Sequence, residues 1–210
     1  MARLIMLVPS DMSEQHLHNA YPRLSAVFAA LGPIEIEPHN GILVAEAITR
    51  IVIGQMLSRN AATSIYSRVA AKRDEIGLAG SWQLDCSSLV SLGLSRRKAQ
   101  TIQEFGVQYQ GNPDRFENWR SLSYNVLRQE VSAFWGLSDW SADMLAIFYF
   151  GLPDVFPSSD GTIKRAICLL EEKVLKGRAL DPTRAKPYRT YLSLYLWRTV
   201  DSGLLKSVNA

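Results

Sequence analysis

The stretch Phe134-Trp135-Gly136-Leu137-Ser138-Asp139-Trp140-Ser141-Ala142 decides the fold, because it joins two segments with the apolar spacing of helices. A tight turn with one glycine separates the segments, so we expect a helix, a turn and a second helix. The first amides of the second helix have no partners within it and attract phosphate, with help from the helix dipole. Taken alone, the stretch fits an ordinary corner between two helices at least as well.

Asp160 is the second informative position, on the loop that follows the second of these helices. An acidic residue just ahead of a helix is usually its N-cap, and Thr162 to Lys176 has helical spacing. A carboxylate hinders phosphate binding, however, so next to a phosphate-binding turn it needs a further purpose. Stabilising a sugar that develops positive charge is such a purpose.

Helical periodicity also dominates the rest of the chain. We expect one N-terminal helix over residues 13–31, and later helices capped by Ser58, Ser95 and Ser123. Only residues 4–8 and 34–37 have the composition of strands, and both segments are short. The sequence therefore predicts an all-α protein.

Composition limits the classes of protein. With 210 residues, 47% of them hydrophobic, the chain can bury one good core or two small ones. A net charge of +3 permits nucleic-acid binding without establishing it. No apolar run approaches the ~20 residues of a membrane helix. Cys86 and Cys168 match no metal or redox spacing, and two cysteines cannot hold an all-cysteine iron–sulfur cluster. We expect an intracellular protein with reduced thiols.

Five blocks in consistent order resemble the helix–hairpin–helix DNA glycosylase superfamily, and within it the branch of 3-methyladenine DNA glycosylase II. The similarity covers about Gly41 to Trp197. The blocks are Ile53 to Ser58, Leu92 to Ala99, the hairpin with Trp140-Ser141-Ala142, Asp154 to Pro157, and Lys186 to Trp197.

This resemblance implies a fold of two closely packed helical lobes, with the active site in the cleft between them. We expect a single domain over residues 1–210. One lobe would span about 40–120, and the other about 121–210 together with the N-terminal helix 13–31.

The resemblance also assigns roles to residues. Asp160 falls on the catalytic aspartate of the family, and Met56, with Leu57 as a neighbour in the same role, falls on the residue wedged into the duplex. The base pocket would be lined by Trp140, Trp197, Tyr188 and Tyr191. The simpler interpretation of Met56 and of the aromatic residues is a place in the core.

DNA-backbone contacts are expected at the hairpin, through Gly136, Leu137, Ser138, Trp140 and Ser141. The main-chain carbonyls of Ser132, Phe134 and Leu137 match positions that hold a monovalent cation, Na⁺ or K⁺, beside the phosphate; no other cofactor is expected.

A basic cluster at a predicted helix start, Arg96, Arg97 and Lys98, would contact phosphate, unless it is simply a solvated face. Lys164, Arg165 and Arg189 are secondary candidates for the same role.

Three departures from the family pattern lie in the hairpin. Trp135 replaces a proline and Ser138 a glycine, which affects turn strain and the approach of phosphate. Trp140 occupies the position of the lysine nucleophile in the strand-cleaving branch, which argues for base removal alone.

The leading hypothesis is a monofunctional DNA repair glycosylase that flips alkylated purines out of duplex DNA and hydrolyses their N-glycosidic bond, leaving an abasic site. We expect a monomer, cytoplasmic and of prokaryotic type, associated with the nucleoid when acting. Two alternatives stay open. One is a glycosylase that acts on oxidised or deaminated bases, or that adds strand cleavage through a lysine such as Lys164; the other is a non-catalytic helical DNA-binding module.

Overall fold

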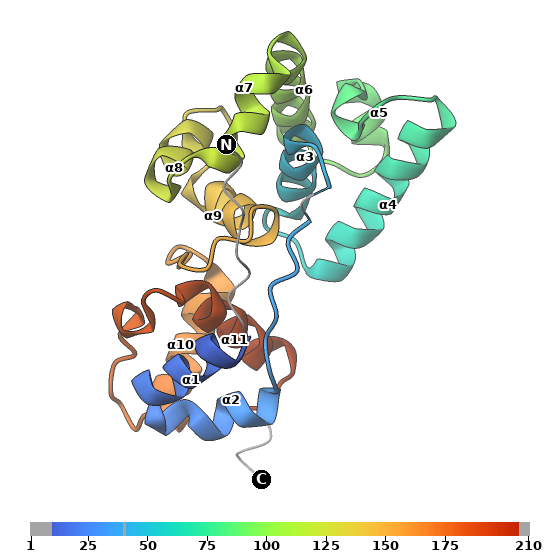
Figure 1. Cartoon of the computed structure of the whole chain (residues 1–210). Coiled ribbons are helices and arrows are strands. Elements are labelled where there is room, and N and C mark those ends of the chain that lie inside the picture. The colour runs from blue at the N-terminus through green and yellow to red at the C-terminus, as the bar shows by residue number, and fades with distance from the viewer. Residues whose placement is uncertain (1–9, 40, 206–210) are drawn as a thin grey trace. The chain divides into compact units, whose positions relative to one another are not determined.

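The computed structural model describes residues 10–39 and 41–205, and every regular element within them is helical (Figure 1). This confirms the predicted all-α class. The α-helices are α1 (Ser10–Ala20), α2 (Ser25–Leu31), α3 (Val44–Gly54), α4 (Arg59–Glu75), α5 (Cys86–Ser91), α6 (Arg96–Gly111), α7 (Pro113–Glu117), α8 (Tyr124–Ser132), α9 (Asp139–Phe148), α10 (Gly161–Lys173) and α11 (Arg189–Asp201). Short 3-10 turns cover Pro22–Leu24, Ser81–Gln83, Asn118–Ser121 and Pro182–Ala185.

The N-terminal segment differs from its prediction in two places. The expected helix over residues 13–31 is divided into α1 and α2 by a 3-10 turn that begins at Pro22. Proline has no amide to donate and its ring clashes with the preceding turn of a helix, so α1 ends before it. Residues 34–37 are irregular, because a strand needs a partner and the described chain offers none. The other candidate strand, residues 4–8, lies outside the described residues.

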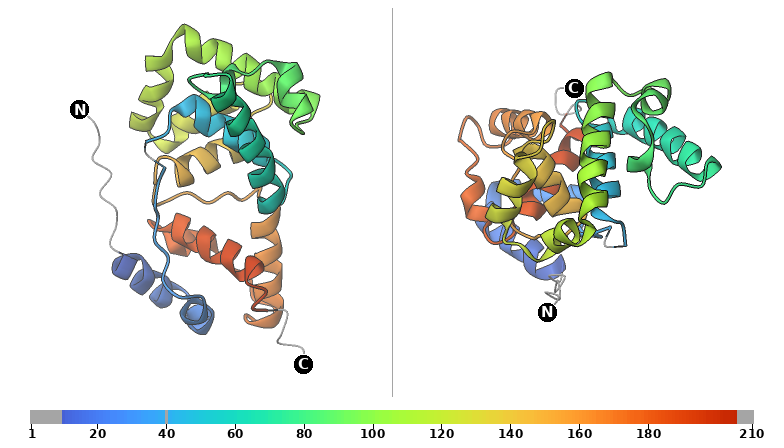
Figure 2. Two further views of the ribbon diagram at one scale, coloured as in Figure 1. Left: turned by 90° about the vertical axis from the view of Figure 1, so that its right-hand side faces the viewer. Right: turned by 90° about the horizontal axis from the view of Figure 1, so that it is seen from above.

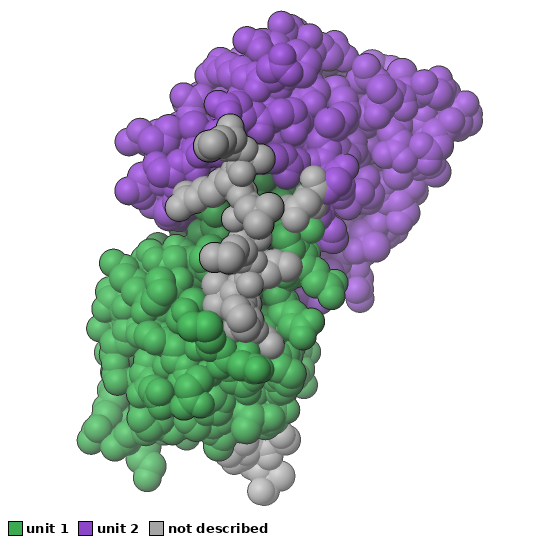
Figure 3. Space-filling view, in the orientation of Figure 1, with its two compact units in different colours: residues 1, 3–38, 146–210 green, residues 2, 39–145 purple. Residues whose placement is uncertain are grey.

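The chain divides into two compact units, coloured separately in Figure 3. Unit 2 comprises His39–Leu145, and unit 1 the described residues up to Pro38 together with those from Ala146 onward. The division therefore falls inside α9, later than the predicted boundary near residue 120. The reason is aromatic packing. Phe134, which follows α8, lies against Phe105, Phe116 and Trp119, at centroid distances of 5.3 to 5.7 Å.

Unit 2 is built around α3, which packs against α4, α6 and α7. Nine of its eleven residues are buried, from Val44 to Ile53 except Arg50. A helix that is buried on nearly all sides needs neighbours on all sides, and these helices provide them for α3. Neither α3 nor any other described helix is long and apolar enough to cross a membrane.

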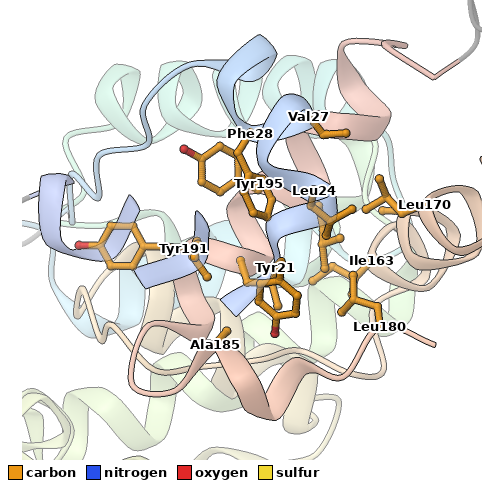
Figure 4. Packing of buried hydrophobic residues seen from close by; sticks show 14 of the residues in the cluster. Tyr21, Leu24, Val27, Phe28, Ile163, Leu170, Leu180, Ala185, Tyr191 and Tyr195 are labelled. Atoms are coloured by element: carbon orange, nitrogen blue, oxygen red, sulfur yellow. The ribbon is translucent and has the colours of Figure 1, made fainter. Parts of the chain in front are cut away.

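Unit 1 pairs α10 with α11, which lie side by side in both Figure 1 and Figure 2. α1, α2 and the short segment between them cover α11 and supply Leu17, Tyr21, Leu24 and Phe28 to its core. In Figure 4 the Phe28 ring meets that of Tyr195, with centroids 4.6 Å apart. The packing fixes the start of α10, where Asp160 lies.

Candidate active site and DNA interface

The turn of the hairpin depends on Gly136. Its φ of +78° is a left-handed conformation that glycine adopts without strain. A Cβ there would also lie 2.0 Å from Oγ1 of Thr101 on α6. The turn therefore packs too closely against α6 for any other residue. This confirms the predicted geometry of helix, glycine turn and helix.

Ser141 has a structural place inside the hairpin. Its hydroxyl accepts hydrogen bonds from the Ser138 amide (3.3 Å) and from Gln55 Nε2 (3.4 Å), and the residue is fully buried. The prediction that Ser141 contacts the DNA backbone is therefore wrong, since no part of it reaches the surface. Leu137 is also buried, whereas Ser138 is exposed and Trp140 half-buried.

An acidic residue, Asp139, begins α9, where the sequence suggests an anion-binding terminus. Its carboxylate accepts hydrogen bonds from Arg128 (2.7 Å) and from the Ser132 hydroxyl (2.8 Å). Arg128 offsets the negative charge that would otherwise repel phosphate, and both contacts tie α8 to α9. Sequence reasoning missed this ion pair, although its eleven-residue spacing spans the turn.

Trp135, in the place of the family's proline, is 48% exposed at the turn. The guanidinium of Arg97 lies over its ring, 5.7 Å from the centroid. This is the geometry of a cation–π contact, which holds an exposed cation beside the hairpin.

The loop between α3 and α4 projects Met56 into solvent. The side chain is 100% exposed, and its φ of +56° is unusual for a residue other than glycine. Leu57, beside it, is also exposed. The interpretation of Met56 as a core residue is therefore wrong. The loop thus presents an apolar side chain to solvent on a left-handed residue, just before the capped start of α4 at Ser58. Such a side chain is suited to contact with another molecule.

The three residues of the basic cluster separate in the structure. Arg96 and Arg97 are exposed at the start of α6. Lys98 is half-buried, and its ammonium donates to the carbonyls of Ile53 (2.9 Å) and Gln55 (2.6 Å). Burial lowers the pKa of Lys98. Because this ammonium is hydrogen-bonded within the protein, Arg96 and Arg97 are the members of the cluster that stay candidates for phosphate contact.

Asp160 is the N-cap of α10, as its position in the sequence predicts. Its Oδ1 accepts a hydrogen bond from the Ile163 amide (2.9 Å) and a second from the indole Nε1 of Trp197 (3.1 Å). The cap and the indole fix the direction of the carboxylate. The cap alone does not require the indole.

Phe148 joins the same site. Its ring lies 5.6 Å from that of Trp197, tilted by 33°, and is 37% exposed although the periodicity of α9 places it in the core. Trp197 is half-buried. Two aromatic rings beside a fixed carboxylate are suited to a flat base attached to a sugar.

The two tyrosines predicted to line the base pocket belong to the core of unit 1. Tyr191 is only 3% exposed, and Figure 4 shows it among the core residues. The prediction for Tyr191 is therefore wrong. Tyr188 is half-buried and packs edge-on against His16 (5.2 Å) and Tyr191 (6.1 Å).

Arg189, a secondary candidate for phosphate contact, is held by Asp154. Its guanidinium donates to Oδ1 (2.6 Å) and Oδ2 (2.9 Å), and these bonds outweigh burial and lower the pKa of Asp154. The pair joins the Asp154 loop to the start of α11, the helix that carries Trp197. Lys164 and Arg165 are exposed on α10. Trp140 belongs to unit 2, and its place in one pocket with Trp197 stays a prediction.

Comparison with known proteins gives a consistent result. No protein-family model matches the sequence. The chain is 28% identical to the alkylbase DNA glycosidase-like protein mag2 of Schizosaccharomyces pombe, over 89% of this chain and 92% of that protein. It is 26% identical to DNA-3-methyladenine glycosylase 1 of the same yeast, over 73% and 71%.

Solved structures of the same group share the fold. The 3-methyladenine DNA glycosylase Mag1 of Schizosaccharomyces pombe, in complex with abasic DNA, superposes with a TM-score of 0.72 at 23% identity, over 90% of this chain and 97% of that one. The 3-methyladenine DNA glycosylase of Archaeoglobus fulgidus gives 0.71 at 16% identity, over 91% and 69%.

The hairpin, the capped aspartate and these similarities together define the class that the chain resembles, the helix–hairpin–helix DNA glycosylase superfamily. Its relatives in sequence include an alkylbase DNA glycosidase-like protein and a DNA-3-methyladenine glycosylase of yeast.

Proposed function

We propose that this protein is a DNA repair glycosylase, which hydrolyses the N-glycosidic bond of alkylated purines in duplex DNA and leaves an abasic site. The observation that carries the proposal is the Asp160 carboxylate, held by the Ile163 amide and the Trp197 indole. The relatives named for alkylbase and 3-methyladenine glycosylase activity support the same reaction and substrate class.

Asp160 is the catalytic residue in this proposal. As the glycosidic bond breaks, the sugar gains oxocarbenium character, and a carboxylate beside it stabilises the developing charge. The same group orients the attacking water or accepts its proton. Because the hydrogen bonds already fix the carboxylate, little reorganisation is needed when the charge develops.

Extrusion of the target nucleotide is assigned to Met56. Unstacking and unpairing cost roughly a few kcal/mol, and an apolar side chain that fills the vacated space offsets part of that cost. Full exposure and left-handed backbone support this role, because both are unfavourable in the free protein. Leu57 adds apolar surface beside it.

The flipped base would stack on Trp197 and Phe148, beside the carboxylate. An alkylated purine carries positive charge and is attracted to an electron-rich ring, for the reason that a cation is. Such a base is also a good leaving group, so modest contacts suffice. Trp140 is proposed to complete the aromatic surface.

The hairpin is proposed to hold the DNA backbone. The exposed Ser138 and the start of α9 are suited to a phosphate, and Arg96 and Arg97 add positive charge nearby. A monovalent cation on the carbonyls of Ser132, Phe134 and Leu137 would strengthen the contact. The Phe134 carbonyl also accepts the Leu137 amide (3.1 Å), and a carbonyl has a second lone pair for a cation.

We further propose that the enzyme removes the base without cutting the strand, and that it acts as a monomer. Trp140 cannot form the Schiff base that a lysine forms at the corresponding position of strand-cleaving relatives. Trapping with borohydride on lesion-bearing DNA tests this directly. A covalent adduct, for instance through Lys164, would contradict it.

The decisive experiment is incubation with methylated duplex DNA, with release of 3-methyladenine and 7-methylguanine measured for the wild type and for Asp160→Asn. Asparagine still caps α10. We expect a folded variant with activity lower by about a hundredfold or more, since electrostatic stabilisation of the transition state is lost.

Two results would contradict the proposal in different ways. A wild type that binds DNA but releases no base from alkylated, oxidised or deaminated substrates is not a glycosylase. A folded Asp160→Asn variant with full activity removes Asp160 from the site while leaving the reaction in place.

A further inference from the structure

Three segments of unit 2 meet at the base of the Met56 loop: the loop itself, the hairpin, and the first turns of α6. Lys98 makes the first connection, from α6 to the loop. Its ammonium donates to the carbonyls of Ile53 and Gln55, on either side of Gly54 at the end of α3. A cation at this place also compensates the negative end of the helix dipole.

Gln55 makes the second connection, from the loop to the hairpin. Its side-chain amide donates to the Gly136 carbonyl (3.1 Å) and to the Ser141 hydroxyl (3.4 Å). One residue thus gives its carbonyl to Lys98 and its side chain to the hairpin turn. Any displacement of the turn is passed to the residue immediately before Met56.

The third connection joins α6 to the hairpin. Thr101, three residues after Lys98, touches Gly136 so closely that a Cβ there would overlap it. Arg97, next to Lys98, lies over the ring of Trp135. The loop, the hairpin and α6 therefore form a closed ring of contacts, and a closed ring has less freedom than a chain of the same contacts.

The cost of this arrangement indicates a purpose. An ammonium taken partly out of water and held by neutral carbonyls is expensive compared with one at the surface. Met56, which gains no contact within the chain, adopts a strained conformation at the end of the same ring.

We propose that Lys98 and Gln55 are positioning residues that hold the Met56 wedge at a fixed place relative to the hairpin. A phosphate bound at the hairpin then brings Met56 to a defined base step. The inference rests on the proposed function of the hairpin and of Met56, and it assigns to Lys98 a role in base extrusion instead of a phosphate contact.

The test uses duplex DNA with an abasic site opposite 2-aminopurine, whose fluorescence rises when it is unstacked. It needs no catalysis. We expect the wild type to raise the fluorescence at saturating protein, and Lys98→Met, Gln55→Leu and Met56→Ala to raise it much less. Lys72→Met, which removes a partly exposed lysine paired with Glu75, is the matched control and should equal the wild type.

Activity separates positioning from general damage to the fold. On an alkylated base paired in a duplex, Lys98→Met should lower kcat by about ten- to a hundredfold, the scale expected for a misplaced group. On the same base in single-stranded DNA, which needs no wedge, the loss should be less than about threefold. If Lys98→Met fails to fold, Gln55→Leu carries the same comparison.

A double-mutant cycle completes the test, because residues that act through one another are not additive. Lys98→Met should cause no further loss on paired DNA when added to Met56→Ala. Full additivity, equal losses on paired and single-stranded substrates, or wild-type fluorescence in both positioning variants would each overturn the inference.

The two proposals can fail separately. A wild type that unstacks 2-aminopurine through Lys98 and Gln55 but releases no base retains the positioning role and loses the glycosylase function. A wild type that releases alkylated bases, with Lys98→Met and Gln55→Leu equally active on paired DNA, retains the function and loses the inference.

Discussion

At the scale of single residues, Asp160 combines a place as a helix cap with the proposed catalytic role. Its Oδ1 accepts hydrogen bonds from the Ile163 amide and from the Trp197 indole. The sequence presents the cap and the catalytic role as alternatives. The structure makes them compatible, because a cap fixes the carboxylate that the reaction uses.

Substitution of Trp197 separates its hydrogen bond from its ring. Trp197→Phe removes the indole N–H but keeps an aromatic face near Phe148. We expect kcat to fall about tenfold, as for loss of a hydrogen bond to a charged group, with KM nearly unchanged. Trp197→Ala should in addition raise KM. Steady-state kinetics on an alkylated duplex checks the split, and an equal rise of KM in both variants would contradict it.

Asp143, on α9, gives a pH dependence of stability. Burial raises its pKa to about 6, against the lowering effects of the Tyr124 hydrogen bond and of Arg128; Asp139 raises it slightly. A carboxyl whose pKa is higher in the folded than in the unfolded protein stabilises it below pH ~4. That contribution is lost as pH rises through about 6, and amounts to about 3 kcal/mol.

Asp143→Asn should therefore gain stability relative to the wild type between pH 4 and pH 7, by up to about 3 kcal/mol. Urea unfolding of both proteins across this range measures the difference. Since asparagine keeps the size of the side chain, a cavity does not complicate the comparison. Parallel pH profiles of the two proteins would show that Asp143 does not titrate as described.

At the scale of elements, the hairpin turn is limited by its neighbour α6. Gly136→Ala places a Cβ against Thr101 and in a left-handed conformation, so we expect a loss of about 1–3 kcal/mol in the free energy of unfolding. DNA affinity should fall too, because the turn moves. Thr101→Ala removes the closest atom and should restore part of the stability when combined with Gly136→Ala. Gly111→Ala, where a Cβ meets nothing, is the control.

Elements with a local signal could be predicted from the sequence. The side chains of Ser58, Ser95 and Asp160 accept amide hydrogen bonds at the starts of their helices, as their positions predict. Ser123 occupies the N-cap of α8 without such a bond. A cap is recognisable because its partner lies two or three residues away in the same chain.

Contacts between distant segments gave no such signal. Its place in a basic run predicts that Lys98 is exposed to solvent. The contact with the carbonyls at the end of α3 exists only in the folded chain. The sequence predicts that Tyr191 lines the base pocket, whereas it is buried on α11, the helix that α1 and α2 cover. An apolar residue such as Met56 is expected in the core, because composition cannot show that a left-handed turn directs its side chain into solvent.

At the scale of the whole molecule, the boundary between the units was the least predictable feature. Unit 1 combines the N-terminal helices with the C-terminal part of the described chain, and its boundary with unit 2 falls within α9 at Leu145–Ala146. Periodicity shows which face of a helix is buried, but not which neighbour buries it. The aromatic packing of Phe134 and the ion pair of Arg115 with Glu130 join the α8 segment to unit 2.

The modest net charge of +3 leads to the last prediction, because phosphate contact then depends on a few placed cations. For duplex DNA, log K falls with log salt by about 0.9 for each phosphate neutralised. Arg96→Ala and Arg97→Ala should each reduce that slope by about one, Arg97→Ala also releasing Trp135. Lys98→Met should leave the slope unchanged, since its ammonium binds carbonyls. Titrations of one undamaged duplex between about 50 and 200 mM salt measure all three. If the slope falls for Lys98→Met and stays constant for both arginine variants, Lys98 contacts phosphate and the prediction is wrong.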